Sequence, residues 1–235
     1  DYGVILGKLQ LDLNEGLTML LAYKLNVLNE VLNIILLLNE IKFNLDDLFI
    51  IPEKNIPLYQ KFKKAKEDIV SKSGDIITLY KIIDKYRNYE KESSKNDFCY
   101  KYFIKKNILD KVLDSYKKNI FKYKSKFKDF NFDEKSLIDE KSIIDEKSLI
   151  EEINSDTSQK IILSFLFGYR YNILVKGKNK DGIFVDIAKE SSLNMAKNST
   201  FFYLSLSKIS GKYQAQIVFT IPQKLSQFYI KILAI

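Results

Sequence analysis

Four short segments near the end of this chain decide its fold class. They read YNILVK at residues 171–176, GIFVDI at 182–187, FFYLSLSK at 201–208 and YQAQIVFTI at 213–221. Each segment is rich in β-branched and aromatic residues, which is typical of β-strands. Turn-forming runs separate them, with Asn179-Lys180-Asp181-Gly182 after the first segment and Ser210-Gly211-Lys212 before the last. We therefore expect a small β-barrel in this part of the chain.

Before residue 130, the apolar residues have a different spacing from that of the strand segments. They recur at helical spacing over 17–28, 76–83 and 109–127, which indicates amphipathic helices. The run Ser73-Gly74-Asp75 precedes the second of these helices and predicts a turn and an N-cap. A further short apolar helix is expected over 161–167. The predicted fold class is α+β, with an N-terminal helical bundle followed by a small β-barrel.

The composition excludes several kinds of chemistry. The 235 residues include no histidine and one cysteine, Cys99. Catalytic Ser-His-Asp and Cys-His groups are therefore excluded, as are internal disulfides and multi-cysteine metal clusters. Cys99 lies between Phe98 and Tyr100, so we expect it to be buried in the core. The cysteine count favours a cytoplasmic location, and no apolar run approaches the ~20 residues that span a bilayer.

The positive charge is concentrated in two blocks. The chain has 38 basic and 30 acidic residues, and only Arg87 and Arg170 are arginine. Residues 101–128 contain 10 basic and 2 acidic residues, and residues 158–235 contain 11 and 3, so each block carries +8. Residues 1–100 are nearly neutral, and residues 132–157 carry −6. Two basic blocks around an acidic connector favour a polyanionic partner such as nucleic acid.

The acidic connector contains a tandem hexamer. The run Asp-Glu-Lys-Ser-Leu-Ile begins at Asp133 and Asp145, and a copy with one isoleucine in place of leucine begins at Asp139. A six-residue step turns a helix by about 600°, so successive apolar pairs point in different directions and no continuous apolar stripe forms. We interpret the repeat as a solvated linker.

No motif in the chain makes a complete active site. The run from Gly3 to Lys8 has one residue too few between its glycines for a phosphate-binding loop, and Leu9 stands where magnesium requires a hydroxyl. The adjacent carboxylates Asp46-Asp47 and Glu151-Glu152 have polar neighbours, so we expect solvated charges rather than a catalytic acid and base. The sequence therefore predicts no catalytic residue, no cofactor and no metal in this chain.

Several segments, in chain order, match the pattern of one enzyme family. The most specific is Ser73–Leu79 (SGDIITL), followed by Phe98–Ile104 (FCYKYFI). The other matching segments are Leu6–Leu13, Asn29–Glu40, Phe49–Pro52 and Lys160–Ile221. Together they resemble the C-terminal region of DEAH-box (DEAH/RHA) RNA helicases. The chain departs from that family at Ile76, where the family has histidine, and at Tyr102, where it has asparagine.

The resemblance implies a domain organisation and a function. Residues 1–13 would end a winged-helix domain, 14–131 would form the ratchet-like helicase-associated domain, 132–157 the linker, and 158–235 an OB-fold. The parent protein, of bacterial source, would be an ATP-dependent RNA helicase whose upstream RecA-like domains bind ATP and magnesium. This region would bind single-stranded RNA and couple it to ATP hydrolysis by those domains. A protein activator would be a further partner, and no membrane insertion is expected.

The candidate RNA-binding residues lie in the two basic blocks, where lysines occur close to aromatic residues. Cationic grooves with aromatic faces are typical of proteins that bind single strands. The predicted nucleic-acid-binding residues are Lys101, Lys105, Lys106, Tyr169, Arg170, Lys176, Lys178 and Lys180. The alternative for each aromatic residue is core packing, and for each lysine it is a solvated surface.

A second hypothesis is a non-catalytic module. A protein-interaction module would recruit a protein activator or an anionic membrane surface without touching RNA. A stand-alone adaptor would bind nucleic acid without any helicase domain. Binding to single-stranded RNA, measured against binding to acidic vesicles, separates these hypotheses.

Overall fold

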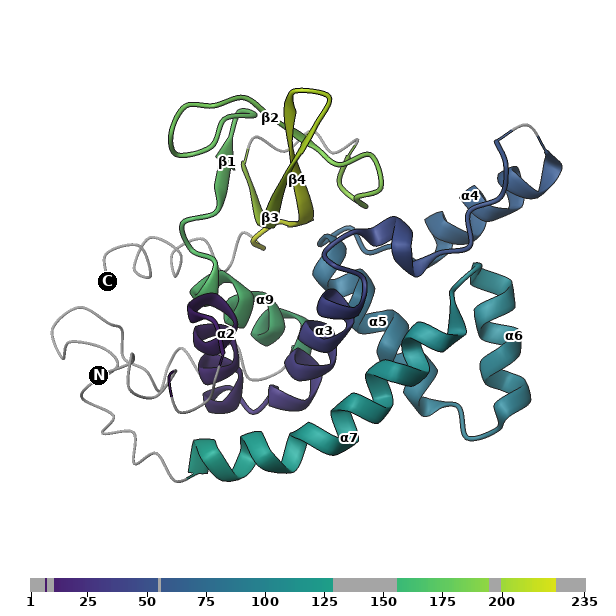
Figure 1. The fold of residues 1–235 in the computed structure, drawn as a ribbon, viewed down its shortest axis with the longest axis horizontal. Coiled ribbons are helices and arrows are strands. Elements are labelled where there is room, and N and C mark those ends of the chain that lie inside the picture. The colour runs from purple at the N-terminus through teal and green to yellow at the C-terminus, as the bar shows by residue number, and fades with distance from the viewer. Residues whose placement is uncertain (1–6, 8–10, 55, 129–155, 195–199, 223–235) are drawn as a thin grey trace, which may run out of the picture. The chain divides into compact units, whose positions relative to one another are not determined.

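The computed structural model describes residue 7 and residues 11–54, 56–128, 156–194 and 200–222. In these residues seven α-helices precede a four-stranded mixed sheet, so the predicted α+β class is confirmed (Figure 1). The helices are α2 (Leu13–Lys24), α3 (Leu28–Glu40), α4 (Pro57–Ile69), α5 (Asp75–Asn88), α6 (Glu92–Tyr102), α7 (Lys106–Lys128) and α9 (Thr157–Gly168), with a short 3₁₀ helix, η1 (Leu45–Leu48). The strands are β1 (Ile173–Val175), β2 (Val185–Ile187), β3 (Thr200–Ile209) and β4 (Lys212–Phe219).

The described residues form two compact units. The first unit contains α2, the part of α7 from Lys117 onward, and α9. The second unit contains the helical segment from Asn33 to Tyr116 and all four strands. The domain boundaries predicted from the sequence stay a prediction.

In the first unit, α2 packs against α9. Each helix begins after an aspartate whose side chain accepts a hydrogen bond of 2.9 Å, Asp12 from the N–H of Glu15 and Asp156 from that of Ser158. Gly168, at the end of α9, lies so close to Thr18 that a Cβ atom would collide with it. Glycine at this position therefore lets the two helices approach closely.

Aromatic rings fill the helical part of the second unit. Phe62 of α4 packs edge-on against Phe49 and Phe103, with ring centroids 6.1 and 5.7 Å apart. Two backbone hydrogen bonds join the chain before α4 to the chain after α6. The N–H of Ile50 donates to the carbonyl of Phe103 at 2.7 Å, and the N–H of Lys105 donates to that of Leu48 at 2.9 Å.

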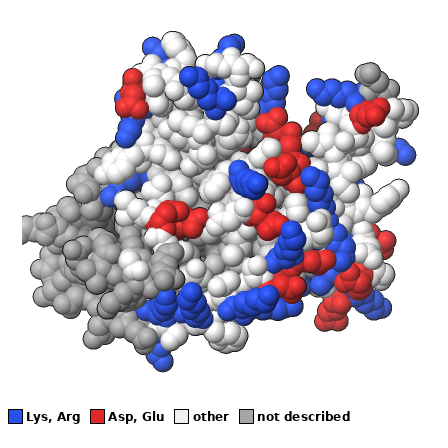
Figure 2. Space-filling model, viewed as in Figure 1, with Lys and Arg blue, Asp and Glu red and all other residues white. Residues whose placement is uncertain are grey.

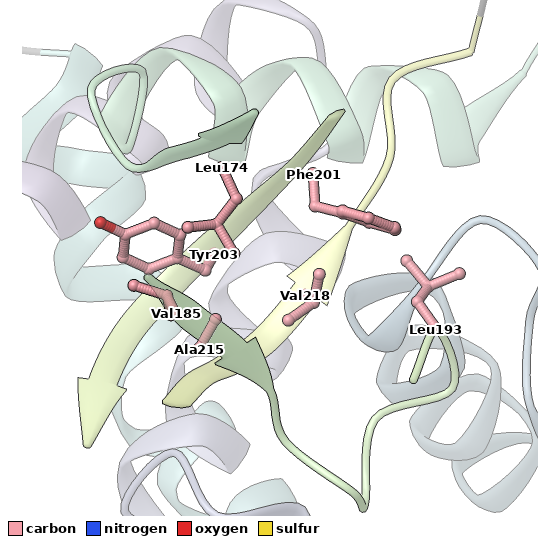
Figure 3. Packing of buried hydrophobic residues seen from close by; sticks show 7 residues of the cluster. All are labelled: Leu174, Val185, Leu193, Phe201, Tyr203, Ala215 and Val218. Carbon is pink, nitrogen blue, oxygen red and sulfur yellow. The ribbon is translucent and has the colours of Figure 1, made fainter. Parts of the chain in front are cut away.

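The sheet of the second unit has the strand order β1-β3-β4-β2. β1 and β4 pair antiparallel with β3, and β2 pairs parallel with β4. The sheet curls into a half-barrel around a cluster of buried apolar side chains (Figure 3). The cluster contains Leu174, Val185, Leu193, Phe201, Tyr203, Ala215 and Val218.

The strands differ in length from the sequence prediction. The long β3–β4 hairpin lies where it was predicted, whereas β1 and β2 have 3 residues each. The reason is a turn in which Val175 and Lys178 exchange backbone hydrogen bonds, which ends β1 early. In the described residues the predicted barrel is thus a four-stranded half-barrel.

Some predicted features lie outside the described residues. These are the tandem hexamer, most of the linker over 132–157, and most of the segment Leu6–Leu13. The described helices include none that is long and apolar enough to cross a membrane.

Candidate nucleic-acid interface

The connection between β1 and β2 carries three predicted site residues. Lys176, Lys178 and Lys180 all lie on it, and all three side chains are exposed. The connection begins with a tight turn, in which the N–H of Val175 donates to the carbonyl of Lys178 at 2.8 Å and the reverse bond is 3.1 Å. Lys176 has a left-handed backbone conformation in this turn, with φ of 50°. The three lysines are thus gathered at one end of the sheet.

The second half of the connection is held by Asn179. Its side-chain oxygen accepts hydrogen bonds from the N–H groups of Asp181 and Ile183, at 3.1 and 2.9 Å. The N–H of Val185 donates to the carbonyl of Gly177 at 2.9 Å, which closes the connection on itself. Because these bonds already order the backbone, little conformational entropy remains to be lost when a ligand binds here.

An exposed aromatic ring adjoins the lysines. Phe184 is 72% exposed, and the Lys178 ammonium lies 4.6 Å from its ring centroid. Lys176 and Lys178 form no ion pair with any part of the chain that the structure describes. A flat apolar ring beside uncompensated cations suits a ligand that has both planar groups and negative charge.

The β3–β4 hairpin extends this basic end of the sheet. Val185 is in register with Tyr213, so the hairpin residues Lys208 and Lys212 are close to the start of β2. In the view of Figure 2, basic side chains predominate at this end of the sheet. The sequence analysis did not identify Phe184, Lys208 or Lys212 as site residues. Phe184 lies on the β1–β2 connection itself, where a backbone bridge sets it opposite Lys178. The parallel pairing of β2 with β4 brings Lys208 and Lys212 near the start of β2, and no local sequence signal predicts that pairing.

Tyr169 and Arg170 lie in the first unit rather than on the sheet. Tyr169 is buried and its ring stacks on Phe165, with centroids 6.4 Å apart. Burial raises the pKa of the Tyr169 hydroxyl, and the charges of nearby carboxylates add to that effect. The guanidinium of Arg170 lies 4.9 Å from the ring centroid of Tyr171, which is half-exposed. The structure thus places Tyr169 in the core, and Tyr171 is the aromatic residue at the surface.

The first basic block is divided among different environments. Lys101 is exposed on α6, with its ammonium 5.0 Å from the ring centroid of Tyr102. Lys105 is half-buried, and its backbone N–H donates a hydrogen bond to the carbonyl of Leu48. Tyr100 is 88% exposed, which leaves one aromatic face of this block at the surface.

Lys106 is engaged in an ion-pair network. Its ammonium lies 2.6 Å from a carboxylate oxygen of Glu92 and 2.7 Å from one of Asp110. The hydroxyl of Tyr86 donates to the other oxygen of Asp110 at 2.6 Å. Partial burial disfavours ionisation of Asp110, but the hydrogen bonds from Lys106 and Tyr86 outweigh it and lower its pKa. The same carboxylates raise the pKa of Lys106, whose charge is balanced within the protein.

Asp75 is a buried carboxylate whose role the sequence analysis did not predict. Gly74 is the N-cap of α5, and Asp75 is the first helical residue. One oxygen of Asp75 accepts from the N–H and the hydroxyl of Ser192, both at 2.7 Å, and the other accepts from the N–H of Val218 at 2.8 Å. Burial raises the pKa of Asp75, and the three donors oppose that shift. Asp75 thus ties α5 to β4 and to the loop after β2.

Gly74 permits this connection. It has a φ of 114°, and a Cβ atom at this position would lie 2.6 Å from the backbone of Phe219 and of Val218. Only glycine combines that backbone conformation with so close an approach. The short run Gly74-Asp75 therefore positions the edge of β4 against the start of α5.

Two further observations concern metal ligands and the single cysteine of the chain. In the described part of the chain, no group of three or more cysteine, aspartate and glutamate side chains could hold a metal ion. Burial raises the pKa of the Cys99 thiol to about 11, so the thiol is protonated near neutral pH. Comparison of the chain with models of protein families and with curated proteins finds no match.

Proposed function

We propose that this chain binds single-stranded RNA as the C-terminal accessory region of a DEAH-box ATP-dependent RNA helicase. One observation carries the proposal: the β1–β2 connection presents Lys176, Lys178 and Lys180 beside the exposed ring of Phe184. Lysines supply the counter-charge that phosphates require, and an exposed ring supplies a surface on which a base stacks. OB-folds bind single strands through the face of a small curled sheet and its loops.

The resemblance to the helicase family gives this surface a context. In that context the helices would belong to the ratchet-like domain, and the half-barrel would be part of an OB-fold. The RecA-like domains that bind and hydrolyse ATP would lie upstream in the parent protein. The chain's contribution would be to hold RNA while those domains move it, which requires cations and aromatic faces rather than catalytic groups. A helical region followed by a curled sheet is compatible with this assignment.

The proposal predicts that the three lysines act as phosphate contacts. Replacing Lys176, Lys178 and Lys180 together by alanine should weaken binding of a fluorescent oligouridylate. It should also reduce the slope of log K against log salt concentration by about 2, since each contact to a single strand contributes about 0.7. The measurement is a fluorescence-anisotropy titration at several salt concentrations, with the full chain.

A second triple variant controls for net charge. Lys64, Lys72 and Lys81 are exposed lysines on or near helices of the same unit, and their replacement by alanine removes the same charge. This control should keep both the affinity and the salt slope. Phe184→Leu should weaken RNA binding without changing the slope, because it removes a stacking face and no charge. Equal losses in the two triple variants, or tighter binding to anionic vesicles than to RNA, would refute the assignment.

A further inference from the structure

An apolar groove lies in the helical part of the second unit, apart from the basic end of the sheet. Its volume is about 800 Å³, and it is bounded by the segment before α4, by α4 itself and by α6. The apolar lining includes Ile50, Ile56, Leu58, Tyr100 and Phe103. Four of these five side chains are exposed to solvent, and only Phe103 is half-buried. Contiguous exposed apolar residues of this kind mark a surface that binds another molecule.

The groove has a rigid floor. The backbone bonds between Ile50 and Phe103 and between Lys105 and Leu48 fix the two segments that form it. Phe103 adopts a left-handed conformation (φ 56°) at the end of α6. Its ring packs on Phe62, so the end of α6 is fixed against α4. A preformed apolar groove loses little conformational entropy when it is occupied, which favours binding.

The charges around the groove are of one sign. Lysines are the charged residues that line it, namely Lys61, Lys101 and Lys106, and no aspartate or glutamate is among the lining residues. The charge of Lys106 is already balanced by Glu92 and Asp110. Lys61 and Lys101 are exposed and form no ion pair with the residues that the structure describes. The occupant must therefore match an apolar floor and two uncompensated cations.

We propose that the groove binds an amphipathic helix of a partner protein, with aliphatic residues on one face and carboxylates beside them. Three of the five apolar side chains named above are aliphatic and would pack against leucine or isoleucine, and the rings of Tyr100 and Phe103 complete the apolar surface. The carboxylates of the helix would pair with Lys61 and Lys101 at the rim. The groove includes Lys101 and Lys106, which the sequence analysis predicted to bind RNA, but no residue of the β1–β2 connection that carries the proposed function. Either proposal can therefore fail without the other.

The test uses a synthetic peptide of about 18 residues, long enough to form a helix when bound. The peptide has leucine at positions i, i+3, i+4 and i+7 and glutamate at the flanking positions. We expect the full chain to bind it, and Leu58→Asp with Ile56→Asp to weaken binding at least about tenfold. The double change Lys61→Glu with Lys101→Glu should weaken binding of this peptide and strengthen binding of a matched peptide with lysine in place of glutamate. That exchange of preference cannot arise from misfolding.

Matched controls isolate the groove. Leu206→Asp with Ile209→Asp adds the same two negative charges at exposed apolar positions of β3 and should leave peptide binding unchanged. A peptide with the same composition in scrambled order should bind more weakly to the wild-type chain. Three results would overturn the proposal: equal affinity for both peptides, no exchange of preference in the Lys61 and Lys101 variant, or loss of a dimer in sedimentation when Leu58 becomes aspartate. The last result would assign the groove to self-association.

Discussion

At the scale of single residues, Asp75 shows how one buried acid can connect distant segments. Its two oxygens accept three hydrogen bonds, from the N–H and hydroxyl of Ser192 and from the N–H of Val218. Among the residues that the structure describes, no lysine or arginine pairs with Asp75, so these hydrogen bonds compensate for the cost of removing the carboxylate from water.

Asp75→Asn should destabilise the second unit although the two side chains have the same shape. Both oxygens of Asp75 accept hydrogen bonds, whereas the amide of asparagine has one accepting oxygen. Its NH₂ group would therefore replace one acceptor and face the donor of Ser192 or of Val218. We expect a loss of about 1–3 kcal/mol in the free energy of unfolding, measured by urea denaturation. Asp84→Asn is the control on the same helix, since Asp84 forms a partly exposed pair with Arg87 and accepts only a long hydrogen bond of 3.4 Å from the amide of Asn88. A loss no greater than that of Asp84→Asn would contradict this account of Asp75.

At the scale of elements, the network of Lys106 and Asp110 joins three helices. Tyr86 belongs to α5, Glu92 to α6, and Lys106 and Asp110 to α7. A similar contact links α3 with α7, where the ammonium of Lys111 lies 2.8 Å from a carboxylate oxygen of Glu40. Polar contacts between helices thus supplement the aromatic packing.

The stability that Asp110 contributes should depend on pH. Because the pKa of Asp110 is lower in the folded chain than in the unfolded one, its contribution is present above the unfolded value, about 3.9, and is lost as the pH falls through the folded value. Asp110→Asn should therefore destabilise the chain at pH 7 by up to about 1 kcal/mol, since the pair is partly exposed. Urea denaturation near pH 3 should show a smaller difference. Asp68→Asn, at an exposed carboxylate of α4, should show little difference at either pH.

How far the sequence predicts these elements depends on the range of the interactions. The apolar spacing over 109–127 predicted α7, and Ser210-Gly211-Lys212 predicted the turn of the β3–β4 hairpin, because both signals are local. The turn-forming residues that follow the first strand also placed the lysines of the β1–β2 connection together on one loop. Local signals did not reveal Phe184 beside Lys178, the pairing of Lys106 with Glu92, or the role of Asp75. Phe184 and Lys178 meet through a turn within one loop, and Glu92 meets Lys106 across the turn between two helices. The role of Asp75 depends on residues 117 and 143 positions further along the chain.

At the scale of the whole molecule, the chain forms two compact units, and each draws on separate stretches of sequence. Cys99, the single cysteine of the chain, lies in the second unit and is buried. The rate at which a reagent labels this thiol therefore measures how readily the second unit opens.

Labelling of Cys99 should follow unfolding of the second unit. Burial and a pKa of about 11 should slow its reaction with a disulfide reagent at pH 8 at least about tenfold relative to the urea-unfolded chain. The control is a chain with Cys99→Ser and Asn107→Cys, in which the thiol lies at an exposed position. That control should react at similar rates with and without urea. Rapid labelling of native Cys99 would mean that this part of the unit opens readily.

The hydrogen bonds of Asp75 have a consequence for when the second unit folds during translation. The partners Ser192 and Val218 follow Asp75 by 117 and 143 residues, so they emerge long after α5 has been made. Until then the carboxylate has no donors and stays hydrated, which keeps the start of α5 from burial. We therefore expect the second unit to acquire its native packing late, after β4 has been translated, because its folding requires contacts of long range.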